Sequence, residues 1–124
     1  MATPPYRLTT EDRNGYLYAS IHGEEDSLEI TMAAVTEIAG ICLARKATKL
    51  LVEHNLPGRL STLDVFKIAS RLPDLYEGVH VGFVIHRTEI PDNPQFLENV
   101  ARNRGGTGRL FKRIEDAEAW LLAL

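Results

Sequence analysis

The chain of 124 residues and 13.9 kDa is 44% apolar and 25% charged, and its 14 basic and 17 acidic residues give a formal charge of −3. These fractions are typical of one folded domain and exclude a fibre or a disordered tail. The acidic excess argues against a nucleic-acid binder, and no apolar run approaches the roughly 18 residues of a transmembrane segment. A single cysteine cannot build a disulfide framework, so we expect a cytoplasmic protein.

Apolar periodicity and turn residues divide the chain into strands and helices. Strands are predicted at 6–12, 16–23, 49–54, 79–86 and 108–112. Helices are predicted at 28–47, from Ser61 or Thr62 to near Pro73, from Asn93-Pro94 to Gly105-Gly106, and at 114–124. Asn14-Gly15 supplies the positive φ angles of a tight hairpin between the first two strands. Residues 1–5 are expected to be a frayed lead-in to a single domain over 6–124.

The order of these elements is β-β-α-β-α-β-α-β-α, which predicts the α/β class. Strands joined through a helix pair in parallel with right-handed crossovers, whereas the initial hairpin is antiparallel. We therefore expect a single-domain, mixed five-stranded sheet. Two strands alternate between apolar and polar residues instead of being apolar throughout, so one face of the sheet is expected to be only partly covered.

The C-terminal third carries a pattern of small, apolar and charged residues: Glu98-x-Val100-Ala101-x-Asn103-Arg104-Gly105, then Leu110-Phe111, then Glu115-x-Ala117-x-x-Trp120-Leu121. With the element order, this pattern resembles the SpoIIAA-like family of small bacterial proteins, whose fold is similar to STAS and Sec14-type domains. The resemblance covers the chain from Tyr16 onward. It implies a β/α superhelix with largely parallel strands in sequential order, and a regulatory or scaffolding module.

In this resemblance, the related anti-anti-sigma factors are switched by phosphorylation at a helix N-terminus. The matching segment here is residues 59–64, which lacks their Asp-Ser-Ser-Gly core. Ser61 and Thr62 begin the second predicted helix, where outward N–H groups and the helix dipole favour an anion. They are candidates for a phosphorylation site or an anion-binding site. The alternative is ordinary N-capping.

A second candidate site combines His22, Glu53 and His86, which fall at the carboxyl ends of three predicted strands. Open α/β sheets bind ligands at this edge, and two imidazoles with a carboxylate can hold zinc and leave a position for water. His54 replaces Glu53 if the strand registers differ. No HExxH or CxxC motif accompanies these residues, so histidines without a metal are the alternative and no cofactor is expected.

The helix predicted at 28–47 is apolar over most of its circumference. One stripe is expected to face the sheet: Leu28, Met32, Val35, Ala39 and Cys42. A second stripe is expected to form the interface of a homodimer: Ile30, Ala34, Ile38 and Ile41. This follows because a helix that is apolar on both sides must be covered on both sides. The alternatives are cover from the hairpin or a neighbouring helix of the same chain, or an interface on the sheet face with Tyr16, Tyr18 and His80.

No set of residues has a recognisable catalytic arrangement. Cys42 lies mid-helix among apolar residues and is expected to be a small buried side chain rather than a nucleophile. The leading hypothesis is therefore a non-catalytic binding or regulatory module that acts through protein–protein contacts. The alternatives are a protein that binds an apolar or lipid-like small molecule and, less favoured, a metal-dependent hydrolase at the strand-end histidines.

Overall fold

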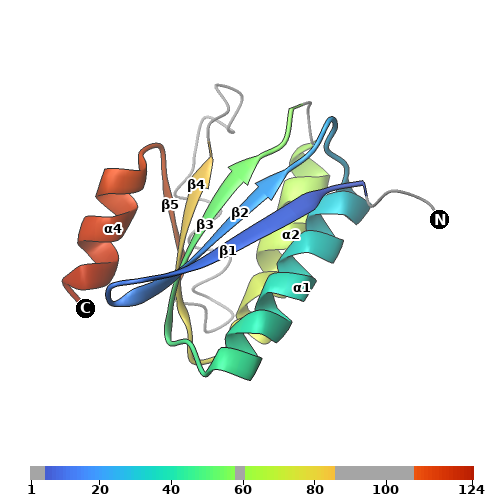
Figure 1. Cartoon of the computed structure of the whole chain (residues 1–124). Coiled ribbons are helices and arrows are strands. Elements are labelled where there is room, and N and C mark those ends of the chain that lie inside the picture. Colours follow the sequence, from blue (N-terminus) through green and yellow to red (C-terminus); the bar gives the residue numbers. More distant parts are fainter. Residues whose placement is uncertain (1–4, 58–60, 86–107) are drawn as a thin grey trace.

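The computed structural model describes residues 5–57, 61–85 and 108–124 (Figure 1). Its strands are β1 (Arg7–Arg13), β2 (Tyr16–His22), β3 (Lys49–Asn55), β4 (His80–Ile85) and β5 (Gly108–Phe111). Its helices are α1 (Leu28–Arg45), α2 (Thr62–Leu75) and α4 (Ile114–Leu122). The helix predicted from Asn93-Pro94 and the predicted metal ligand His86 lie outside the described residues.

The strands form one five-stranded sheet in the order β1-β2-β3-β4-β5. β1 runs antiparallel to β2, and every later pair of neighbours is parallel. Gly15 closes the β1–β2 hairpin with a φ of 96°, which a residue with a Cβ rarely adopts. The predicted α/β class, the mixed sheet and the sequential strand order are confirmed.

Helices lie on both sides of this sheet: α1 and α2 are against one face, and α4 is against the other (Figure 1). Because side chains alternate between the faces of a strand, β2 contributes to two separate cores. Leu17, Ala19 and Ile21 belong to the core that includes α1, whereas Tyr16 and Tyr18 pack with α4. The two alternating sets of β2 side chains are therefore covered by different helices, one set by α1 and the other by α4.

The α1 helix is covered within one chain, by the sheet and by α2 (Figure 1). Ala34 and Ile38 have no exposed surface, and Ile30 is only 8% exposed. Ile41 is partly buried against the same core. The predicted homodimer interface on this stripe is therefore wrong, because the same chain already supplies the cover. The sheet face considered as an alternative interface also has a cover, since its two tyrosines pack with α4.

The α2 helix continues past Pro73 to Leu75, although the sequence predicted its end near the proline. Proline lacks a backbone N–H, but its fixed φ is compatible with a helical turn. Tyr76 anchors this end of α2, because its hydroxyl donates a hydrogen bond to the Val35 carbonyl of α1 at 2.6 Å. Its backbone N–H donates to the carbonyl of Leu72 at 2.9 Å. This final turn therefore has tertiary support.

Candidate functional site

The N-terminus of α2 is capped by Ser61. The Ser61 hydroxyl accepts a hydrogen bond from the backbone N–H of Asp64 at 3.0 Å, and the residue is exposed. Thr62 is the first residue of the helix, and Leu63 beside it is 60% exposed. The capping interpretation of Ser61 is confirmed, while modification of Ser61 or Thr62 stays a prediction.

The predicted metal ligands His22 and Glu53 have different partners. Glu53 lies opposite Ser20 rather than His22, and its carboxylate accepts a hydrogen bond from the Tyr18 hydroxyl. His22 Nε2 is 2.5 Å from the Ser20 hydroxyl, and its Nδ1 is 3.5 Å from the Asn55 amide nitrogen. Within the described ranges, no group of three or more His, Cys, Asp and Glu residues is placed to hold a metal ion.

His54, the substitute ligand, is instead part of a buried polar cluster with Asp26 and Thr31. Its Nε2 is 3.3 Å from an Asp26 carboxylate oxygen, and the Thr31 hydroxyl donates to the other oxygen at 2.5 Å. The Asp26 side chain has no exposed surface. This cluster joins the end of β3 to the start of α1. His54 does not replace Glu53 beside His22, because it lies opposite Ile21 in the register and its side chain leaves the sheet on the other face.

Sequence reasoning missed this cluster. In the sequence, Asp26 lies just before the helix predicted at 28–47, where negative charge suits the helix N-terminus and no tertiary partner is indicated. Thr31 was the available signal, because it is a polar residue that α1 buries among apolar neighbours, with 4% of its surface exposed. A buried hydroxyl needs a partner, but the sequence does not say which one.

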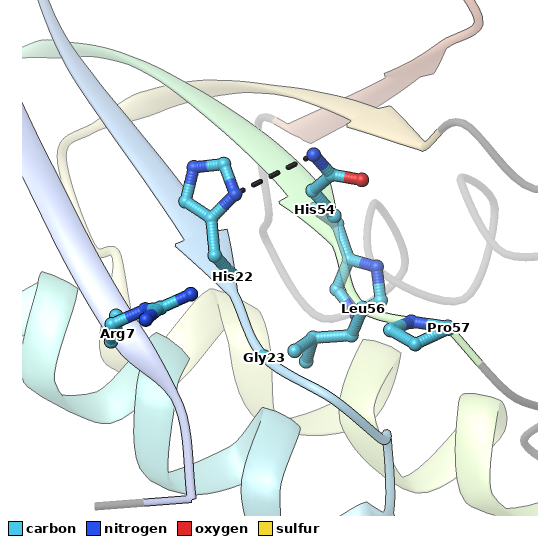
Figure 2. A pocket seen from close by; sticks show the side chains of 7 residues that line it. Arg7, His22, Gly23, His54, Leu56 and Pro57 are labelled. Atoms are coloured by element: carbon cyan, nitrogen blue, oxygen red, sulfur yellow. Dashed lines mark hydrogen bonds between the residues drawn. The ribbon is translucent and has the colours of Figure 1, made fainter.

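A cavity of about 470 Å³ lies at the edge of the sheet where β2 and β3 end (Figure 2). Its lining residues are Arg7, His22, Gly23, His54, Asn55, Leu56 and Pro57. Gly23 allows the segments before β1 and after β3 to approach closely. A Cβ at this position would lie 2.7 Å from the Leu56 side chain and 3.0 Å from the Pro5 carbonyl. The polar lining can offer N–H donors to a ligand.

On the face of the sheet that α4 covers, two tyrosines of β2 are paired with carboxylates. The hydroxyl of Tyr16 donates to Glu118 of α4, and that of Tyr18 donates to Glu53. Burial raises the pKa of both tyrosines, and the carboxylate partners raise these pKa values further because they favour the protonated phenol. The guanidinium of Arg13 lies 3.8 Å from the centre of the Tyr18 ring. The Tyr16–Glu118 bond joins the sheet to α4, and the contacts of Tyr18 link β1, β2 and β3.

None of the helices in the described ranges has both the length and the apolar character needed to cross a membrane.

Comparison with known proteins finds a likeness among solved structures. No protein-family model matches the chain, and no curated protein matches it. Among solved structures, the chain is similar to an anti-sigma factor antagonist from Mycobacterium paratuberculosis, with a TM-score of 0.63 and 21% sequence identity. The likeness covers 98% of this chain and 97% of that one. The chain thus shares the α/β fold of that solved structure, and the predicted α/β architecture with sequential strands is confirmed.

Proposed function

We propose that this protein is a regulatory module that binds a protein partner through the surface around the N-terminus of α2. The observation that carries the proposal is the likeness, over nearly the whole chain, to a protein named as an anti-sigma factor antagonist. The proposed partner class is therefore an anti-sigma factor. No catalytic activity is required for such a function.

The proposed surface is defined by Ser61 and Leu63. Ser61 is exposed at the cap of α2, and Leu63 leaves 60% of its surface in solvent. An apolar side chain beside free helix N–H groups offers a partner both apolar contact and hydrogen bonds. A phosphate on Ser61 would add about −1.5 to −2 charges at this surface and would change how a partner packs on it.

The test is calorimetric titration of the protein with the anti-sigma factors encoded in the same genome. Leu63→Glu should weaken binding by about tenfold or more, because the charge must be desolvated at the interface. Leu43→Glu is the matched control, since Leu43 is an apolar residue that is 82% exposed near the C-terminal end of α1. This control should bind within about twofold of wild type.

Ser61→Asp separates the phosphorylation site from the binding surface. Weaker partner binding by this variant, with unchanged stability, would support a switch at Ser61. If Ser61→Asp bound the partner as tightly as wild type, the proposed switch at Ser61 would be contradicted, whereas the proposed binding surface would not be affected. The surface itself would be contradicted if Leu63→Glu also bound as wild type, or if no anti-sigma factor bound at all.

The homodimer and the cytoplasmic location stay predictions. Because the stripe proposed as the dimer interface is buried within one chain, self-association would need another surface. Light scattering coupled to size exclusion tests it directly. A peak that stays near the chain mass of 13.9 kDa as the protein concentration rises would contradict the dimer.

A further inference from the structure

Three nitrogen-bearing side chains occupy one row across the end of the sheet. Arg7 of β1 lies directly opposite His22 of β2, and His22 is level with Asn55 of β3. Side chains in such a row leave the sheet on the same face, with Cβ atoms of neighbouring strands about 5 Å apart. All three line the cavity at this edge, and the bond between Asn55 and His22 is dashed in Figure 2. We call Arg7, His22 and Asn55 the donor row.

The donor row has unused capacity to donate hydrogen bonds. Across the described ranges, no hydrogen bond or ion pair engages the Arg7 guanidinium, which carries five N–H donors. The Asn55 amide uses one N–H toward His22 at 3.5 Å, which is a long and weak hydrogen bond. Its second N–H is available to a ligand.

The described carboxylates near the donor row lie outside the cavity lining. Glu53 is on the same face of β3 as Asn55, two residues earlier, and it accepts a hydrogen bond from the Tyr18 hydroxyl. Among the described residues that line the cavity there is no carboxylate. Glu24 and Glu25 follow Gly23 in the chain, but they are exposed and lie outside the lining. The Asp26 side chain is fully buried, and its carboxylate contacts Thr31 and His54.

His54 adds a second, independent observation. Its side chain is 10% exposed and lines the same cavity from β3. Its Nε2 contacts Asp26, while its Nδ1 is buried and has no hydrogen-bond partner in the described part of the chain. Buried polar atoms without a partner are uncommon, so the unpaired Nδ1 marks the end of β3 as a place where the described chain leaves a hydrogen bond unmade.

We propose that this cavity binds a small oxyanion, the phosphate or carboxylate group of a small solute, with Arg7 as its charged anchor. A guanidinium pairs with either group through two parallel N–H bonds. The amide of Asn55 and the imidazole of His22 provide the remaining polar contacts of the donor row. A volume of about 470 Å³ exceeds what an inorganic anion needs and lies within the roughly 300–1,000 Å³ of small-molecule pockets. The proposal does not depend on partner binding at α2.

Titration of ¹⁵N-labelled protein with sodium phosphate, glycerol phosphate and sodium acetate, at constant ionic strength, tests the proposal. The amide signals of Gly23, Asn55 and Leu56 should shift and saturate with at least one of these anions. Saturation by acetate would identify a site for carboxylates. Saturation by inorganic phosphate alone would identify a site for the free anion. Tightest binding of glycerol phosphate would identify a site for phosphate esters. Each of these results supports an oxyanion pocket. Sodium chloride at the same ionic strength should cause no saturable shift.

Arg7→Gln should lower the affinity for the anion by about tenfold or more, since the charged anchor is lost. Arg45→Gln is the matched control, because Arg45 bonds Asp12 at 3.1 Å, near the opposite end of β1 from Arg7. It should change the affinity by less than about twofold. The amide spectrum itself reports that each variant is folded. Linear, non-saturating shifts with all three anions, or wild-type affinity in Arg7→Gln, would overturn the proposal.

Discussion

Ser27 and Ser61 perform the same local task at the starts of two helices. Each hydroxyl accepts a hydrogen bond from the N–H three residues later, from Ile30 at 3.1 Å and from Asp64 at 3.0 Å. The first N–H groups of a helix have no partner inside it, so a serine there stabilises the helix without any regulatory function. Regulation at Ser61 must therefore be shown by an effect beyond stability.

Replacing Ser61 by Ala should lower the free energy of unfolding by about 1 kcal/mol, because the cap is lost. Ser61→Asp should leave it nearly unchanged, since Asp caps as well as Ser and its charge suits the dipole. Urea denaturation measures both. Thr36→Ala on the exposed side of α1 is the control, with a change below about 0.5 kcal/mol. If Ser61→Ala were as stable as wild type, the Ser61 cap would contribute nothing to stability.

The thiol of Cys42 should be inert in the folded protein. It is 2% exposed, and burial raises its pKa to about 11. Because only the thiolate reacts, labelling by an aromatic disulfide reagent at pH 8 should be slow, and it should become rapid in denaturant. The raised pKa also means that the folded state holds this proton more tightly. Stability from this group is full below the thiol's ordinary pKa of 9.0 and is lost as the pH rises toward 11. Fast labelling of the native protein would contradict this burial.

At the scale of the element, α4 is held by a narrow apolar face. Ala117 and Leu121 are fully buried against a core that contains Leu51 and Val84. Gly82 of β4 permits this approach, because a Cβ there would come within 3.3 Å of the Ala117 side chain. The next residue, Leu122, is 51% exposed. Two adjacent leucines thus occupy opposite environments on one short helix.

Leu121→Ala should destabilise the fold by about 3 kcal/mol, through lost burial and the cavity that remains. Leu122→Ala, the matched control one residue away, should change the free energy of unfolding by less than about 0.5 kcal/mol. Thermal or urea unfolding distinguishes them. Equal effects of the two substitutions would mean that α4 docks on another face.

At the scale of the whole molecule, local patterns predicted the α/β class and the mixed sheet, and the family resemblance implied the sequential strand order. Asn14-Gly15 predicted the hairpin, alternation indicated strands, and Ser61 or Thr62 predicted the start of α2. The cover of α1 could not be predicted, because a helix that is apolar all round shows that it is buried but not whether α2 or a second chain buries it. The pairing of His54 with Asp26 was also hidden, since it depends on the register of β3 against α1.

The central claim, that a protein partner binds at the N-terminus of α2, is tested most directly by mapping the contact. Amide chemical shifts of the ¹⁵N-labelled protein are followed while an anti-sigma factor that binds in calorimetry is added. The account predicts that the largest shifts fall on Ser61, Leu63 and the first turns of α2. The account would be contradicted if the largest shifts fell on α4, or near Leu43 at the C-terminal end of α1, while the amide signals around Ser61 did not change.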